Sequence, residues 1–223
     1  MKHIVIDFEM NNVSQDSEAR AICGMEIIEI GAVKLNEDLN EISSFRTYVK
    51  PEYNDIITKR INKLTGITME LVAEAPRFNE AFRMFTNWCL DVDAEVRLYA
   101  WSDNDYNQFT NEMILKSVTP TIEEECLLKE PWSNFQDEFD RDLGFKKNLS
   151  LKTALYMAGI DSIGREHDAL DDARNTALLL RVFQNKNLYE STLRRIKEAM
   201  NPTPLGNTLG SIFDFTSLKN DLG

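Results

Sequence analysis

Cysteine, histidine and positive charge are all scarce in this chain. Its 223 residues include two histidines and three cysteines, Cys23, Cys89 and Cys126. The cysteines are odd in number and far apart, and none forms a Cys-x-x-Cys pair, which argues against a disulfide framework and a cysteine-based zinc site. We interpret all three as small buried side chains.

Long apolar runs are also missing. No segment approaches the length of a membrane-spanning helix, and the short N-terminal apolar stretch ends at an acid, unlike a secretory signal. We therefore expect a cytoplasmic protein. With 43% hydrophobic residues, the chain is long enough for one sizeable core. We expect a single domain at residues 1–200 and a loosely held tail at 201–223, which either docks on the domain or binds a protein partner.

The charge balance is strongly acidic. There are 25 lysines and arginines against 37 aspartates and glutamates, a formal net charge of −12. Broad electrostatic binding of nucleic acid relies on surplus positive charge, so a passive nucleic-acid binder is disfavoured. An acidic site that binds divalent cations is compatible with this balance, because the ions supply positive charge where a phosphate would bind.

Apolar periodicity predicts strands early in the chain and helices later. The predicted strands are 3–8, 26–35, 45–49 and 96–101, and the predicted helices are 78–90, 105–115, 132–143, 150–158, 169–183 and 189–200. The first three strands have short connections, which indicates an antiparallel meander. The later alternation of strand and helix is typical of an α/β layer fold with a mixed sheet. Residues 10–25 are too polar for the core and predict a loop.

Two acids, Asp7 and Glu9, end the first apolar run. Side chains two residues apart in a strand share a face, so both carboxylates point the same way, roughly 6.5 Å apart along the backbone. On a buried strand this pair needs compensating positive charge and indicates a site for a hard cation. The pair alone leaves a second interpretation open, in which both acids are solvated beyond the strand. Glu26 and Glu29 are further acids, for which edge positions on a strand give an adequate explanation.

A second acidic segment follows the strand at 96–101, where Asp103 and Asp105 begin a helix. Acids at the carboxyl end of a strand lie where open α/β sheets place their ligands. Capping of the helix N-terminus is the alternative explanation, because serine and aspartate are preferred there.

The third and most specific segment is residues 167–173. Five helical residues turn through about 140° net, so His167 and Asp172 could not share a face of one regular helix. His167 must therefore precede the helix. With Asp168 as the N-cap, Asp172 falls on the inward stripe together with small alanines. Close approach of this helix to the sheet would bring Asp172 to the acids of the first strand, with His167 above them.

In this order the three segments resemble the three exonuclease motifs of the DEDDh 3′→5′ exonucleases, the DnaQ-like branch of the ribonuclease-H-like fold. Residues 27–33 are similar to the family's second strand, and residues 64–68 to its Thr-Gly-Ile turn. The resemblance covers about residues 3–185. It is closest to the ERI-type and KapD-type members of the family.

The second motif departs from those members at one position. The bulky Phe109, four residues on, aligns Asp105 rather than Asp103 with the motif's acid. Ser102, however, stands where the ERI-type and KapD-type members carry glycine.

The resemblance implies a mixed five-stranded sheet flanked by helices, and a pair of Mg²⁺ or Mn²⁺ ions. The residues implied as catalytic are Asp7, Glu9, Asp105, His167 and Asp172, the four acids being the metal ligands. His167 is implied to take the proton from the attacking water. Met10 and Asn11 stand where relatives hold the terminal nucleotide, and with Trp101 they are the candidate substrate contacts.

Three functional hypotheses follow. The leading one is a metal-dependent 3′→5′ exonuclease that acts on single-stranded RNA or DNA ends, with RNA favoured, and releases nucleoside 5′-monophosphates. The second is a proofreading subunit whose tail at 201–223 binds a DNA polymerase. The third is a catalytically silent nucleic-acid-binding module, against which the five intact site residues argue.

Overall fold

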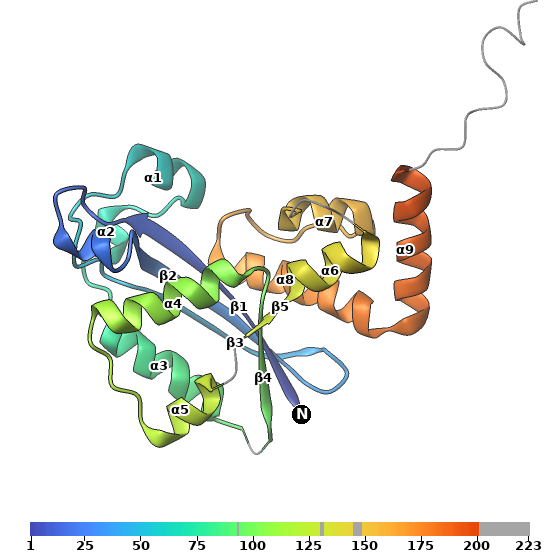
Figure 1. The fold of residues 1–223 in the computed structure, drawn as a ribbon, viewed down its shortest axis with the longest axis horizontal. Helices are drawn as coiled ribbons and strands as arrows, with labels where there is room; N and C mark the ends of the chain where they lie inside the picture. The colour runs from blue at the N-terminus through green and yellow to red at the C-terminus, as the bar shows by residue number, and fades with distance from the viewer. Residues whose placement is uncertain (93, 130–131, 145–148, 201–223) are drawn as a thin grey trace, which may run out of the picture.

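The computed structural model describes residues 1–92, 94–129, 132–144 and 149–200. Within these residues, a five-stranded sheet lies between two groups of helices (Figure 1). This architecture confirms the predicted mixed sheet flanked by helices. The tail expected at 201–223 lies outside the described residues.

The sheet has the order β3-β2-β1-β4-β5, so β1 lies at its centre. The strands are β1 (Lys2–Asn12), β2 (Met25–Leu35), β3 (Glu41–Tyr48), β4 (Val96–Ala100) and β5 (Ser133–Asn134). β1, β2 and β3 pair in antiparallel fashion, as the predicted meander requires, whereas β4 is parallel to β1 and β5 is parallel to β4.

β1 extends four residues beyond the prediction. After an irregularity in the ladder at Glu9 and Met10, the strand stays paired with β2 as far as Asn12 and Met25. Backbone pairing therefore overrides the polar composition of this segment. Only the middle of the loop predicted at 10–25 remains, and it contains the short 3₁₀ helix η1 (Glu18–Ala21).

Within the described residues, six of the helices follow the predicted ranges to within three residues, and three short helices lie outside those ranges. The helices are α1 (Lys59–Thr65), α2 (Met69–Val72), α3 (Phe78–Leu90), α4 (Asp103–Leu115), α5 (Ile122–Leu128), α6 (Phe135–Leu143), α7 (Leu151–Ala158), α8 (Ala169–Gln184) and α9 (Lys186–Met200). The helix predicted from residue 132 begins instead at Phe135. Ser133 and Asn134 pair with β4 as a short edge strand, and Asn134 then caps α6.

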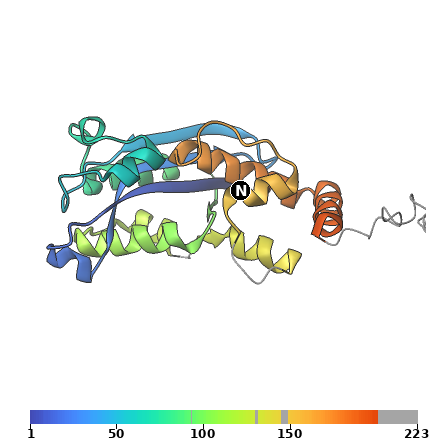
Figure 2. The ribbon, with the colours of Figure 1, turned by 90° about the horizontal axis from the view of Figure 1, so that it is seen from above.

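Alternation along β1 divides the core into two layers. Ile4, Ile6 and Phe8 pack with α3 and α4, while Val5 points to the opposite layer with α6, α7 and α8. Figure 2 shows α4 on one side of β1 and α8 on the other. The face of β1 that carries odd-numbered residues is therefore the face that α8 covers.

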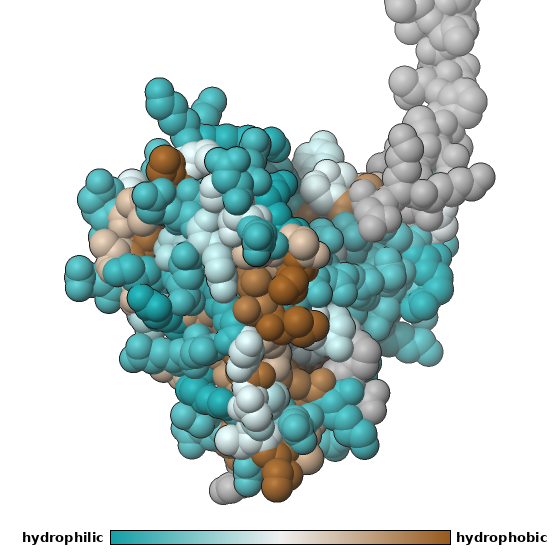
Figure 3. Space-filling view, turned by 60° about the vertical axis from the view of Figure 1, so that its left-hand side comes forward, coloured by the Kyte–Doolittle hydropathy of each residue, from teal (hydrophilic) through white to brown (hydrophobic). Residues whose placement is uncertain are grey.

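The face of the molecule in Figure 3 is mainly hydrophilic, with a narrow hydrophobic band near its middle. Cys23 and Cys89 are buried as predicted, but Cys126 is exposed, which corrects that prediction for α5. None of the helices in the described part of the chain combines the length and the apolar character that a bilayer crossing requires.

Candidate active site

The first two acids are placed by β1 at the centre of the sheet. Asp7 and Glu9 continue the alternation of Val5 and lie on the face that α8 covers. β4 ends opposite Ile6, so the β1 backbone that carries the acids extends past the end of its parallel neighbour. This end of the sheet is where ligands bind in open α/β folds.

Asp105 approaches β1 from the first turn of α4. Ser102 caps that helix, and its hydroxyl accepts a hydrogen bond of 3.3 Å from the amide of Asn104. Asp105 is buried, and its Oδ1 accepts a hydrogen bond of 3.3 Å from the amide of Phe8. Asp103 is exposed at the helix start. The structure therefore brings Asp105, and not Asp103, to the acids of β1.

Close packing of α8 brings in the fourth acid. Gly31 of β2 is the ladder partner of Asp7, and a β-carbon at Gly31 would overlap the backbone of Ala169 and Leu170. Glycine at this position allows the start of α8 to lie directly on the sheet. Asp172, one turn further along, consequently reaches the acids of β1, as the small residues of α8 predicted.

His167 lies in the loop before α8, as the helical geometry required. Its backbone is left-handed, with φ of +62°, and its amide donates a hydrogen bond of 2.9 Å to Oδ2 of Asp172. Asp168 caps α8 by accepting a hydrogen bond from the amide of Asp171. Glu9, His167 and Asp172 each offer a ligand atom, and these atoms all lie within 4.8 Å of one another.

Burial raises the pKa of every acid in this cluster. The pKa of Asp7 lies well above its usual value, first because of burial and then because of the charges of Asp105 and Asp172. Burial raises the pKa of Glu9 to about 8 and that of Asp105 to about 7. Burial also raises the pKa of Asp172, although the amide of His167 opposes the shift. Ionisation of the whole cluster therefore requires added positive charge.

A divalent cation fits this cluster. None of the four acids forms an ion pair with a lysine or arginine among the residues that the structure describes. Several buried carboxylates without a cationic side chain are unfavourable when ionised, and carboxylate oxygens are the ligands that Mg²⁺ and Mn²⁺ prefer.

A second group of charges lies beside the cluster, and we call Glu29, Arg46 and Asp168 the Arg46 clamp. The guanidinium of Arg46 on β3 lies 2.6 Å from Oε1 of Glu29 and 2.7 Å from Oδ2 of Asp168. Glu29 is the ladder partner of Glu9, and its Oε2 accepts a hydrogen bond of 3.3 Å from the amide of Ala169. The clamp therefore ties the start of α8 to β2 and β3.

The explanation of Glu26 and Glu29 by edge positions is wrong. β2 lies between β1 and β3, and both side chains are at most 1% exposed. Glu26 accepts hydrogen bonds from the amides of Glu52 and Tyr53 and forms an ion pair of 3.1 Å with Lys116. Both acids therefore have structural partners of their own, Glu29 beside the four-acid cluster and Glu26 with Lys116.

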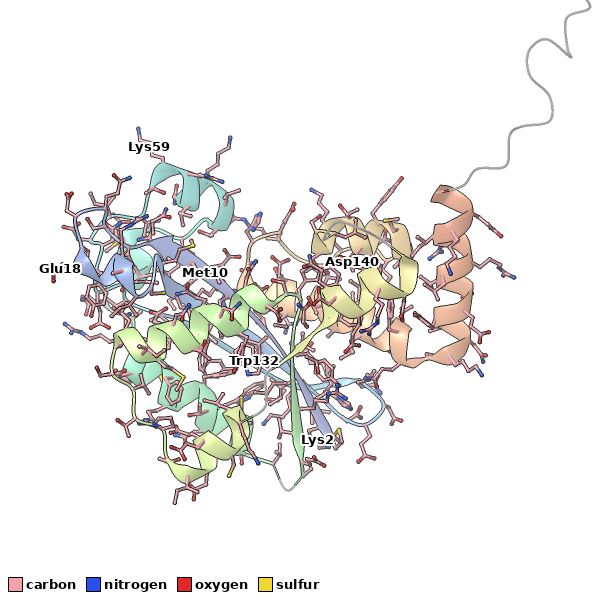
Figure 4. All side chains as sticks on the ribbon, viewed as in Figure 1. Lys2, Met10, Glu18, Lys59, Trp132 and Asp140 are labelled. Atoms are coloured by element: carbon pink, nitrogen blue, oxygen red, sulfur yellow. The ribbon has the colours of Figure 1, made fainter. Side chains whose placement is uncertain are left out.

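Two of the three candidate substrate contacts are buried. Asn11 is fully buried, and its Nδ2 donates a hydrogen bond of 3.1 Å to the carbonyl of Ile56. Trp101 is 7% exposed and packs edge-on against Phe135 in the core, so it offers no open ring face to a base. Met10, labelled on β1 in Figure 4, remains partly exposed just beyond the acids.

Sequence reasoning did not identify the structural role of Gly31, the Arg46 clamp, or the hydrogen bond that Arg165 donates to the carbonyl of Leu64 in α1. A lone glycine inside a buried strand is a signal of close backbone approach. Acids inside an apolar strand are a signal of buried ion pairing. Neither pattern predicts which residue makes the contact, because that residue lies in a distant part of the chain.

The site has two carboxylates on the central strand, one at the start of a neighbouring helix and one on the packed helix α8, with a histidine in the loop before α8. This arrangement defines the DEDDh class of nucleases. The model of the RNase_T exonuclease family matches residues 4–180, and the chain belongs to this exonuclease family, in its ERI-type branch. Enzymes of this family depend on divalent metal ions, in agreement with the chemistry of the cluster.

Individual relatives of the chain also have names that describe exonucleases. The chain is 29% identical over 228 residues to ERI1 exoribonuclease 2 of Mus musculus, covering 93% of this chain but 32% of the relative. It is 24% identical over 192 residues to the 3′-5′ exonuclease crn-4 of Caenorhabditis elegans, covering 82% of this chain and 62% of that protein. The chain thus spans less than two thirds of the length of either relative.

The fold also matches a solved structure. The nuclease domain of 3′hExo, a DEDDh family member bound to rAMP, superposes with a TM-score of 0.69 at 24% identity. The match covers 84% of this chain and 93% of that domain. At this identity the likeness supports the ribonuclease-H-like fold.

Proposed function

We propose that this chain is a metal-dependent 3′→5′ exonuclease that hydrolyses phosphodiester bonds at the 3′ end of single-stranded nucleic acid and releases nucleoside 5′-monophosphates. The observation that carries the proposal is the convergence of Asp7, Glu9, Asp105 and Asp172 with the His167 loop, although these residues come from three separate segments of the chain. We further propose that RNA is preferred, which the exoribonuclease name of the Mus musculus relative supports.

The four acids would hold two Mg²⁺ or Mn²⁺ ions. Ions bound there would activate the attacking water and offset negative charge on the attacking and leaving oxygens. Asp7 and Glu9 are fixed by the central strand, and Asp105 is fixed by its bond to the amide of Phe8. The protein would therefore supply these ligands from fixed elements of the fold.

His167 would act as the general base. Its loop is held by Asp172, and its ring offers a nitrogen close to Glu9 and Asp172. A ring nitrogen at this position can take the proton of the attacking water. A cavity of about 320 Å³, lined in part by His167, Asp172 and Lys152, adjoins this position and offers room for part of a nucleotide.

The decisive experiment compares 5′-labelled RNA and DNA oligonucleotides incubated with Mg²⁺, Mn²⁺ or EDTA. We expect a ladder of 3′-shortened products that disappears with EDTA and in the Asp7→Asn and His167→Ala variants. Asp38→Asn is the matched control, because Asp38 is an exposed acid in the turn between β2 and β3. Chromatography of the products should show nucleoside 5′-monophosphates.

Two results would overturn the proposal. Shortening that persists in Asp7→Asn would place the activity at another site or in a contaminant. A folded protein that binds oligonucleotides but cleaves none of them with Mn²⁺ present would instead be a silent binding module.

A further inference from the structure

Helix α1 carries an unusual concentration of positive charge. Ile61 and Thr65 anchor the helix in the core, while Lys59, Arg60 and Lys63 are exposed. We call these three exposed side chains the α1 cationic face. Figure 4 labels Lys59 and shows its side chain extending from α1 away from the body of the molecule.

The α1 cationic face is not neutralised by neighbouring acids. Among the described residues, none of its three members forms an ion pair, whereas Arg46, Lys116 and Arg174 all do. In a chain with a net charge of −12, three adjacent unpaired cations form a local region of opposite sign. Such a region attracts anions even though the molecule as a whole repels them.

The location of α1 connects this face to the active site. Arg165, two residues before His167, donates a hydrogen bond of 3.0 Å from Nη2 to the carbonyl of Leu64 at the end of α1. The same guanidinium lies where a β-carbon of Gly66 would project. The end of α1 therefore touches the loop that carries His167, and Figure 1 shows α1 beside the loop that leads into α8.

We propose that the α1 cationic face binds the phosphodiester backbone of the single-stranded substrate upstream of the nucleotide being removed. This inference rests on the proposed exonuclease function. The acidic cluster would engage only the terminal phosphodiester, and the remaining strand needs a separate positive surface because the molecule is acidic. The face is close enough to the His167 loop to serve the same strand.

The dimensions of the helix suit this role. Lys59 and Lys63 are four residues apart and are separated by about 6 Å along the helix axis. Phosphates of a stacked strand are spaced by about 3.4 Å along its axis, so the face spans about two or three of them. Contacts of this kind neutralise phosphates without reading bases, which predicts binding that depends on substrate length and salt but little on sequence.

The test replaces all three members of the face by alanine, as Lys59→Ala, Arg60→Ala and Lys63→Ala together. Alanine favours helix, so α1 should keep its fold, which circular dichroism and thermal melting will check. The matched control is the triple variant Lys186→Ala, Arg194→Ala and Lys197→Ala on α9, which removes the same charge from another exposed helix.

Two measurements are made on each triple variant over a series of salt concentrations. The first is kcat/KM for a single-stranded RNA of about 20 nucleotides and for a dinucleotide. The second is binding of the longer RNA by fluorescence anisotropy in an Asp7→Asn background, which reports binding without turnover. Each lost phosphate contact should make the slope of log affinity against log salt shallower by about 0.7.

We expect the α1 triple variant to lose affinity for the longer RNA by about tenfold and to show a slope shallower by about 2. Its kcat/KM should fall more for the longer RNA than for the dinucleotide, whereas the α9 triple variant should match the wild type. An α1 triple variant that matches the α9 variant in slope and in length dependence would overturn the inference while leaving the exonuclease function intact. Loss of that function would instead show as an inactive wild type.

Discussion

The amide of His167 donates a hydrogen bond of 2.9 Å to Oδ2 of Asp172, so the proposed general base is held in place by a proposed metal ligand. His167 also has a left-handed backbone, a conformation that costs a residue with a β-carbon about 1–2 kcal/mol. The surrounding contacts must offset that cost. Asp172 therefore has two separable roles, one as a charge and one as an acceptor.

Substitution of Asp172 can separate these roles. Asp172→Asn removes the charge but keeps an oxygen that can accept the amide of His167, whereas Asp172→Ala removes both. We expect both variants to lose activity, and only Asp172→Ala to change the position of the loop. The amide and ring resonances of His167 in heteronuclear NMR spectra provide the measurement. Equal displacement of these resonances in both variants would contradict the proposed anchoring role.

Gly31 tests whether close approach of α8 assembles the site. In Gly31→Ala the new methyl group would meet the backbone of Ala169 and Leu170, which cannot move aside as a flexible side chain could. We expect a loss of about 1–3 kcal/mol in the free energy of unfolding and a fall in kcat, because displacement of α8 also moves Asp172. Denaturant unfolding and turnover measurements check both effects.

Gly24→Ala is the control for that substitution. A β-carbon at Gly24 meets no atom within 4 Å, so this variant should unfold and react like the wild type. If Gly31→Ala behaved in the same way, close contact at β2 would not be needed for the site.

Arg46 should act as a positioning residue. Arg46→Met leaves the buried Glu29 without its cation and frees Asp168 at the start of α8. We expect kcat to fall about tenfold with little change in KM, because substrate binding surfaces are not touched while the His167 loop loses its anchor. Arg46→Lys, which keeps the charge but not the forked geometry, should recover part of the loss.

Arg174→Met is the matched control for Arg46. Arg174 also joins α8 to β3, through an ion pair of 2.9 Å with Glu41, but its partner is exposed whereas Glu29, the partner of Arg46, is buried. Equal losses of kcat in Arg46→Met and Arg174→Met would show that the Arg46 clamp stabilises the fold in general and does not specifically position the His167 loop.

The raised pKa values predict how stability depends on pH without metal. The pKa of Glu9 is about 8 in the folded protein against 4.5 in the unfolded chain, so the folded state binds the proton more tightly. The resulting stabilisation is complete below pH 4.5 and is lost as pH rises through 8. In EDTA, the Tm of the wild type should therefore fall between about pH 5 and 8 more steeply than the Tm of Glu9→Gln.

Divalent cations should reverse this trend. Mn²⁺ competes with protons for the same carboxylates, so the rise in Tm on adding Mn²⁺ should be larger at pH 8 than at pH 6. The two melting series, with EDTA and with Mn²⁺, provide the measurement. An Mn²⁺ effect that is independent of pH would show that the cation binds outside the buried cluster.

Much of the fold could be predicted because its signals are local. β2 and helices such as α3 carry apolar periodicity within their own sequence, and Asp168 caps α8 as its residue type and position indicated. β5 has only two residues and no period of its own, so its existence depends on pairing with β4. The extension of β1 likewise depends on its neighbour and not on its own composition.

The site likewise has features that local spacing predicts and features that depend on long-range contacts. The spacing of Asp7 and Glu9, and of His167 and Asp172, contains enough geometry to predict which side chains share a face. The contact of Arg46 with Asp168 spans 122 residues, and no spacing in the sequence encodes it. The burial of Asn11 and Trp101 depends equally on packing. Their residue types alone therefore could not show that these side chains are buried.

The two parts of the site, the acids on β1 and the loop with His167, should differ in how readily they unfold locally. The segment that carries Asp7 and Glu9 is paired with β2, and the amide of Phe8 donates to Asp105, so its amide hydrogens should exchange with solvent only when the whole domain unfolds. The segment with His167 is held by a few hydrogen bonds and should exchange through local opening. A low concentration of denaturant should therefore abolish activity by displacing His167, while the sheet that carries Asp7 and Glu9 is still folded.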